Sequence, residues 1–188
     1  MAMDPLSFDV GHLVRRTVAS LYSSLVTRPT GQAVRLAIEN ALAENPGGVS
    51  LSIIDLSQVT IIDFSCADEV VAKLLLRFLE ENRPREVFFL FRGIQELHRD
   101  PIEVALERQS LLAVSETHDG SFELLGMPTP REREAWRALE RRRAVSMAEA
   151  RELTPADEER GVLDDLVAKR VALLDPDHGR YRALSSLL

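Results

Sequence analysis

The chain has 188 residues, of which 45% are hydrophobic and 28% charged, and its formal net charge at pH 7 is −7; this composition is typical of a soluble globular protein with one large or two small domains. The acidic balance argues against general affinity for nucleic acid, and a single cysteine, Cys66, excludes an internal disulfide and a thiolate metal site. The first residues lack the pattern of a signal peptide and no apolar run approaches the roughly 18 residues of a membrane span, so we expect a cytoplasmic protein without membrane contact.

The N-terminal segment predicts a helical layer that precedes a sheet. Residues 6–10 are a candidate short strand. Apolar residues at helical spacing in 13–25 predict a helix that stops at Arg28-Pro29, because a residue before proline avoids the helical region. Thr30 is a candidate cap for a second helix, and the helix breakers of residues 45–48 end it. The turn at residues 28–31 that opens this helix is either a candidate anion site or a simple link between two helices.

The centre of the predicted fold is a strand–helix–strand unit over residues 49–91. Residues 49–56 form an almost continuous apolar run, typical of a strand buried on both faces, and residues 87–91 repeat this pattern. Between them, residues 67–78 place apolar side chains on one face of a helix. Its opposite face carries Asp68, Glu69, Lys73, Arg77 and Glu81. On this face we expect the ion pairs Glu69–Lys73 and Arg77–Glu81, whose members are four residues apart.

Further along, the chain predicts a short helix and a hairpin. Asp100, Pro101 and Glu103 fit a helix start, with a cap, a proline at the first position and an acid at the third. Residues 111–117 and 121–125 are strand-like and flank an Asp-Gly turn, a strong hairpin signal. We expect this hairpin to extend the edge of the sheet or to face a second domain.

Gly126 and the prolines at 128 and 130 mark a domain boundary, so residues 1–126 and 127–188 are predicted as two domains. Three helix starts follow, and they pair Thr129 with Glu132, Ser146 with Glu149, and Thr154 with Asp157. Two strand-like runs at 171–174 and 180–184 then flank a turn-rich tip. Three helices and a terminal hairpin are typical of a winged helix-turn-helix.

The central stretch resembles the STAS domain, which sulfate transporter tails and anti-sigma factor antagonists share. In those antagonists a strand leads to Asp-Ser-Ser-Gly at a helix start, and a partner kinase that also acts as an anti-sigma factor phosphorylates the second serine. The matching positions here are Asp63, Phe64, Ser65 and Cys66, so the aspartate and the second serine are retained. Together with residues 28–31, they are more similar to STAS-like domains of unknown function, over roughly residues 6–115.

The resemblance implies that Ser65 is a phosphorylation switch. It also implies a partner-binding surface made of Asp63, Phe64, Cys66, Asp68 and Glu69. A structural alternative is that Ser65 only caps the helix, in a near capping box with Asp68. A phosphate would suit a helix N-terminus, whereas the nearby aspartates would repel it. Cys66 is expected to be a small core residue.

Residues 127–188 are similar to winged-helix domains of bacterial transcription regulators. The third helix would read DNA, yet its exposed positions are mostly acidic: Asp157, Glu158, Glu159, Arg160, Asp164 and Asp165. Such carboxylates repel phosphates, so we expect a protein-contact or structural role. If DNA were bound, the contacts would come from Arg141, Arg142, Arg143, Lys169, Arg170, Arg180 and Arg182.

Catalytic and cofactor patterns are not found. The histidines His12, His98, His118 and His178 are scattered without metal-ligand spacing, so we expect no metal, no cofactor and no enzymatic activity. The expected fold is α/β, a STAS-like sheet with packed helices followed by a winged helix. The expected function is a regulatory switch that binds a serine kinase or an anti-sigma factor-like protein, with pairing of two copies along a sheet edge left open. The alternatives are a DNA-binding transcriptional regulator and an enzyme with an unfamiliar site.

Overall fold

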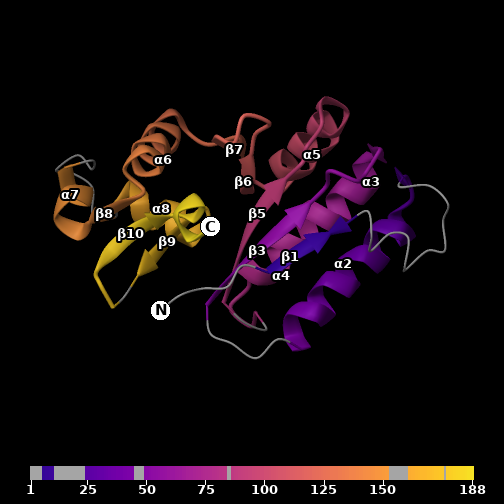
Figure 1. Cartoon of the computed structure of the whole chain (residues 1–188), viewed down its shortest axis with the longest axis horizontal. Helices are drawn as coiled ribbons and strands as arrows, with labels where there is room; N and C mark the ends of the chain where they lie inside the picture. The colour runs from indigo at the N-terminus through magenta and orange to yellow at the C-terminus, as the bar shows by residue number, and fades with distance from the viewer. Residues whose placement is uncertain (1–5, 11–23, 45–48, 84–85, 153–160, 176) are drawn as a thin grey trace.

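The computed structural model describes residues 6–10, 24–44, 49–83, 86–152, 161–175 and 177–188, and it has a mixed α/β fold. In chain order the elements are β1 (Leu6–Asp9), β2 (Ser24–Leu25), α2 (Arg28–Glu44), β3 (Ser50–Asp55), β4 (Ile61–Ile62), α3 (Phe64–Ala67), the π-helical segment η1 (Asp68–Lys73), α4 (Leu74–Leu79), β5 (Val87–Arg92), α5 (Glu96–Arg108), β6 (Leu112–Glu116), β7 (Phe122–Gly126), α6 (Pro130–Arg142), β8 (Ala144–Ser146), α7 (Met147–Glu152), α8 (Val162–Ala168), β9 (Ala172–Asp175), β10 (Arg180–Ala183) and the 3-10 helix η2 (Leu184–Leu187). Figure 1 shows their arrangement.

A five-stranded sheet with the order β1-β3-β5-β6-β7 forms the centre of the molecule. The first four strands are parallel and β7 is antiparallel to β6, so the predicted hairpin extends the edge of the sheet. The predicted core strands are confirmed as β3 and β5. They form because β-branched and aromatic residues favour a pleated, buried surface.

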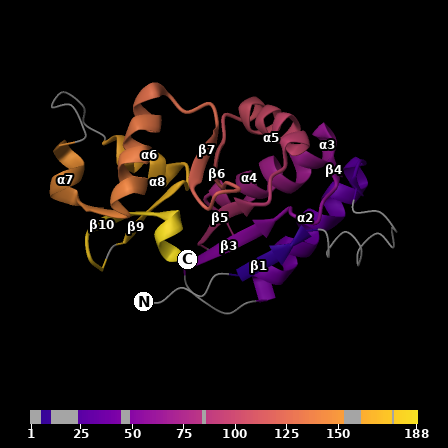
Figure 2. The same cartoon turned by 45° about the horizontal axis from the view of Figure 1, so that its top comes forward.

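The two faces of this sheet bury alternate residues of each strand. Ile54, Phe89 and Phe91 face a core shared with α2, α4 and α5, whereas Leu51, Phe88 and their alternates face a second core. Figures 1 and 2 show the three helices on one side of the sheet and the C-terminal segment on the other. Both faces are therefore covered, which explains the continuous apolar runs of β3 and β5.

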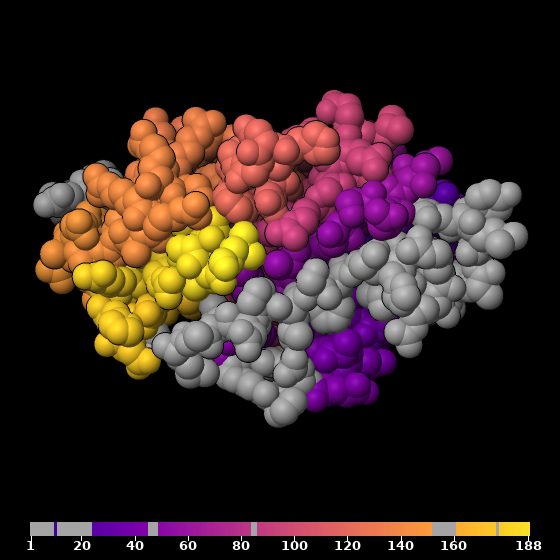
Figure 3. All heavy atoms as spheres, in the orientation of Figure 1, coloured from indigo at the N-terminus to yellow at the C-terminus, as the bar shows by residue number. Residues whose placement is uncertain are grey.

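The C-terminal segment supplies the second cover of the sheet. Its strands form a three-stranded antiparallel sheet of order β8-β10-β9, flanked by α6, α7 and α8. Trp136, Leu166 and Leu184 lie in the same hydrophobic cluster as Phe88 and Leu90 of the central sheet. In the space-filling view the orange and yellow C-terminal atoms lie directly against the salmon-coloured β6–β7 hairpin (Figure 3). One core thus continues across residue 126.

A single arginine adds polar contacts to this packing. Arg170 donates from Nε to the carbonyl of Val87 at 3.1 Å, and its Nη2 lies 2.5 Å from a carboxylate oxygen of Glu86. The guanidinium also lies over the ring of Phe88, 4.6 Å from its centroid. These three partners all precede or begin β5, so Arg170 ties the C-terminal segment to the central sheet.

Two of the three predicted C-terminal helix starts are confirmed. The Thr129 hydroxyl accepts from the Glu132 N–H at 3.2 Å, and the Glu132 carboxylate accepts from the Thr129 N–H at 2.8 Å. The same reciprocal pair joins Ser146 and Glu149. The third predicted start, at Thr154, lies outside the described residues.

The predicted N-terminal helix is wrong at its end. Residues 11–23 lie outside the described part, and Leu25 belongs to strand β2. Helix α2 begins at Arg28, so Pro29 lies in the first turn, where its missing N–H removes no helical hydrogen bond. Thr27 supplies the cap in place of Thr30, since its hydroxyl oxygen lies 3.4 Å from the Thr30 nitrogen.

The predicted start of α5 at Asp100 is also wrong. The helix begins at Glu96, one turn earlier, and Pro101 lies inside it. His98 takes the place of the usual acid in the first turn, because its Nδ1 accepts from the Gln95 N–H at 3.2 Å. Asp100 and Pro101 therefore resemble a helix start, but the actual cap, made by Gln95 and His98, lies one turn earlier and uses less typical residues.

Candidate functional site

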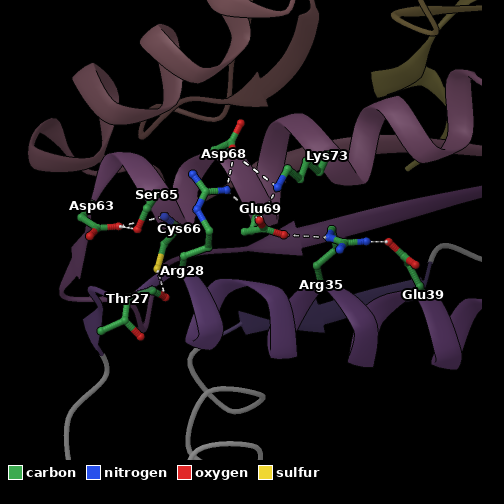
Figure 4. A network of polar contacts seen from close by, with 10 residues as sticks. All are labelled: Thr27, Arg28, Arg35, Glu39, Asp63, Ser65, Cys66, Asp68, Glu69 and Lys73. Carbon is green, nitrogen blue, oxygen red and sulfur yellow. Dashed lines mark hydrogen bonds and ion pairs between the residues drawn. The ribbon is translucent and has the colours of Figure 1, made fainter.

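Two short parallel strands bring the starts of two helices together. Ser24 pairs with Ile61 and Leu25 with Ile62, and each strand leads within two residues to a helix. The Asp63 N–H donates to the carbonyl of Leu25 at 2.8 Å and fixes this arrangement. The N-termini of α2 and α3 therefore lie side by side, and Figure 4 shows the polar side chains between them.

Asp63 caps the helix that carries Ser65. Its Oδ1 accepts the Cys66 N–H at 2.8 Å and the Ser65 hydroxyl at 2.9 Å. The interpretation of Ser65 as the cap, in a box with Asp68, is therefore wrong, because the cap lies two residues earlier. Burial raises the pKa of Asp63, but the hydrogen bonds from Cys66 and Ser65 outweigh burial and leave the pKa below its ordinary value.

Cys66 is a buried core residue, as predicted. Burial and the nearby Asp63 carboxylate raise the pKa of its thiol to about 12, so the thiolate is not formed at neutral pH. The thiol donates to the Thr27 carbonyl at 2.9 Å. A Cβ at Gly31 would lie 3.0 Å from the Cys66 Cα and 3.1 Å from the Glu69 Cβ, so the glycine permits the close approach of α2.

The prediction that Glu69 lies on the exposed face is wrong. Its side chain is 3% exposed and faces α2, a neighbour that periodicity within one helix does not reveal. The carboxylate accepts from Arg28 at 2.8 Å, from Arg35 at 3.2 Å and from Lys73. Burial raises the pKa of Glu69, but the hydrogen bonds from Lys73, Arg28 and Arg35 hold it below its ordinary value.

The helix that carries Glu69 changes from α-helical to π-helical geometry one residue before Glu69. Residues 68–73 are π-helical, and such segments are frequent at functional sites. The expected Glu69–Lys73 pair forms within this segment. The expected pair Arg77–Glu81 does not, because Arg77 binds Glu80 at 2.9 Å one residue earlier.

Arg28 joins the start of α2 to the same carboxylates. Its Nη1 donates to Asp68 Oδ2 at 2.7 Å and to Glu69 Oε1 at 2.8 Å, while its side chain is 50% exposed. Lys73 lies 3.6 Å from Asp68 and completes the cluster. The sequence placed Arg28 in a candidate anion-binding turn and predicted the Glu69–Lys73 pair, but it gave no sign of Arg35 as a partner, because Glu69 was expected in solvent.

Exposed apolar side chains border Ser65. Phe64, the residue before it, is 47% exposed, and Ile61 on β4 and Val26, which follows β2, are exposed to a similar degree. Ser65 itself is partly buried. The predicted partner-binding residues are thus divided: Phe64 is open to solvent, Asp63 and Asp68 are partly buried, and Cys66 and Glu69 are buried.

The candidate DNA contacts are also divided. Lys169 binds Glu132 at 2.5 Å, and Arg170 binds Glu86 and Val87 beside the central sheet. Arg182 donates to the Ser186 carbonyl at 3.1 Å. Arg143 binds Ser185 at 2.7 Å, although its side chain is 57% exposed. The remaining candidates, which lie exposed at the end of α6 and the start of β10, are Arg141, Arg142 and Arg180.

Neither of two grooves found on the described residues is lined by Ser65. A groove of about 680 Å³ runs along α6 and includes Trp136 and Arg137. Within the described ranges, no group of three or more His, Cys, Asp or Glu side chains could hold a metal ion, and no helix is long and apolar enough to cross a membrane. The comparisons with protein-family models, curated proteins and solved structures found no match.

Proposed function

We propose that this chain is a non-enzymatic cytoplasmic regulatory protein whose STAS-like part binds a protein partner through the surface around Ser65. The observation that carries the proposal is the position of Ser65, whose hydroxyl lies in the first turn of a helix beside the exposed ring of Phe64. A modifiable hydroxyl next to apolar surface is a suitable place for a phosphate-controlled contact. The partner we propose is a serine kinase or an anti-sigma factor-like protein.

Charge and solvation give the switch its direction. A phosphate on Ser65 would add a charge of about −1.5 to −2 between Asp63 and Asp68 and beside Phe64. A partner that packs on Phe64 would then have to bury part of that charge, which is unfavourable. We therefore propose that the unmodified chain binds the partner and that the phosphorylated chain releases it.

A structural role for the C-terminal segment belongs to this proposal. The element order α6-β8-α7-α8-β9-β10 and the sheet order β8-β10-β9 support its interpretation as a winged helix. The hydrophobic cluster shared with β3 and β5, together with the contacts of Arg170, favours a winged helix that covers the sheet. Pairing of two copies along the edge strand β1 is compatible with this role, because β1 ends the sheet.

DNA binding is the second candidate function. It is favoured by three exposed arginines, Arg141 and Arg142 at the end of α6 and Arg180 at the start of β10. Hydrogen bonds to its carboxylate, and then the charges of Arg142 and Arg180, lower the pKa of Glu149, so these two charges act on the same carboxylate of α7. The acidic first turn of α8, with Asp164 and Asp165, disfavours it. A gel-shift series decides the matter, because true DNA binding weakens steeply with salt.

The experiment that tests the proposed function is recovery of the tagged full chain from its native cells. Mass spectrometry of the chain should find phosphate on Ser65 in part of the population, together with a co-purifying serine kinase or sigma-control protein. A second bait with Phe64→Ser should lose that protein, whereas the control Met127→Ser, at a site 69% exposed and distant in the chain, should keep it. An unmodified Ser65 with no such partner contradicts the proposal.

A further inference from the structure

Arg28 uses only one side of its guanidinium in the described structure. Both of its hydrogen bonds, to Asp68 and to Glu69, come from Nη1. Its Nε and Nη2 make no hydrogen bond to any residue of the described ranges. Figure 4 shows these nitrogens on the side of the guanidinium turned away from Asp68, toward the part of the network that contains Ser65. Arg28 therefore has free donors next to an occupied one.

Helical spacing places these donors near Ser65. Asp68 and Glu69 follow Ser65 by three and four residues, so all three side chains lie on one helical face, with about 5–6 Å between Cβ atoms. Arg28 contacts both acids, and the preceding residue, Thr27, accepts the Cys66 thiol at 2.9 Å. The first turn of α2 is thus fixed beside the first turn of α3.

We infer that Arg28 binds the phosphate when Ser65 is phosphorylated, an inference that rests on the proposed function. In the transfer, the Ser65 oxygen loses its proton and forms a bond to the terminal phosphorus of a nucleoside triphosphate, and the bond from that phosphorus to the leaving diphosphate breaks. The new phosphate oxygens accept from Nε and Nη2 of Arg28. Two parallel N–H donors of a guanidinium match two phosphate oxygens, which a lysine cannot do.

The surrounding charges make this role specific to Arg28. Without it, the phosphate would face the carboxylates of Asp63 and Asp68, which repel it. Glu69 would not be left as an unpaired buried charge if Arg28 turned further toward the phosphate, because Arg35 and Lys73 also bind Glu69. Arg35 lies seven residues further along α2, about two turns away, and contacts Glu39 and Glu69. It shares the buried partner of Arg28 but is remote from Ser65.

This difference supplies a matched pair of variants. The full chain would be produced with phosphoserine incorporated genetically at position 65, and the pKa of the phosphate would be measured by phosphorus NMR over a pH series. Because a bound cation favours the dianion, Arg28→Gln should raise this pKa by about one unit or more. Arg35→Gln should leave it unchanged, and Arg28→Lys should give an intermediate value.

The outcomes separate this inference from the proposed function. A phosphate pKa that is equal in the unsubstituted chain and in Arg28→Gln overturns the role of Arg28, as does an equal rise in Arg28→Gln and Arg35→Gln. Since the phosphoserine is incorporated directly, the result does not depend on a native kinase. A chain found unmodified in its native cells would contradict the proposed function and leave the measured role of Arg28 standing.

Discussion

The Ser65 hydroxyl donates to Oδ1 of Asp63 at 2.9 Å, so the residue that caps the helix also orients the hydroxyl. The same oxygen accepts the Cys66 N–H at 2.8 Å. Adding a phosphate to Ser65 removes the hydroxyl proton and with it one of these two hydrogen bonds. The modification would therefore act on the cap as well as on the surface.

Replacement of Asp63 should weaken the fold more than replacement of Ser65. Asp63→Ala removes the acceptor of a free N–H in the first helical turn, and the loss of such a cap costs about 1 kcal/mol. Ser65→Ala removes only the hydroxyl donor and keeps the cap. Urea unfolding should show a lower midpoint for Asp63→Ala than for Ser65→Ala, and the reverse order would contradict the assignment of Asp63 as the cap.

Gly31→Ala should be destabilising because the new methyl would meet two atoms that cannot move away easily. The Cys66 Cα would lie 3.0 Å and the Glu69 Cβ 3.1 Å from it. Overpacking of this kind typically costs about 1–3 kcal/mol. Gln32→Ala, at an exposed neighbouring position in the same helix, is the control and should be close to neutral. Equal stability of the two variants in thermal unfolding would show that α2 is not held tightly against α3.

Glu69→Gln should destabilise the chain in a pH-dependent way. The substitution removes a buried charge that binds Arg28, Arg35 and Lys73. Since Arg28 and Lys73 are partly exposed and Arg35 keeps Glu39, the expected cost is that of lost charged hydrogen bonds, about 1–3 kcal/mol. Because the folded pKa of Glu69 is below its ordinary value of 4.5, its contribution is complete above that value and is lost as pH falls through the folded pKa. The difference between the unsubstituted chain and Glu69→Gln should therefore shrink in acid unfolding curves below about pH 4. A constant difference down to pH 2 would contradict this account.

Removal of the C-terminal segment should expose apolar surface on the sheet. Leu51, Ile53, Phe88 and Leu90 face the cluster that residues 127–188 complete. A chain of residues 1–126 should therefore bind a hydrophobic dye and aggregate, since large contiguous apolar patches are rare on monomeric proteins. A monomeric fragment that unfolds cooperatively with no dye binding would instead show that the first 126 residues form an independent domain.

The sequence predicts the elements whose signal is local. The apolar runs of β3 and β5, the Asp-Gly hairpin and the capping boxes at Thr129 and Ser146 all depend on residues close together in the chain. The burial of Glu69 depends on α2, which approaches through Gly31 from more than thirty residues away. Periodicity within one helix cannot show a neighbour of this kind.

The start of α5 and the cover of the sheet were missed for related reasons. His98 acts where a glutamate is usual, so the first turn of α5 lacks the common pattern. The linker prolines indicate a boundary but carry no information about docking. The contact of Arg170 with Glu86 joins residues 84 positions apart and is a property of the folded chain alone.

The central claim is that the surface around Ser65 and Phe64 binds a protein partner only when Ser65 is unmodified. The most direct test compares capture from native lysate by two full-length baits that differ only in serine or phosphoserine at position 65. The account predicts that a serine kinase or sigma-control protein is captured by the serine bait and is reduced at least tenfold on the phosphoserine bait, a difference of about 1.4 kcal/mol in binding free energy. Identical protein sets in equal amounts on both baits would contradict it.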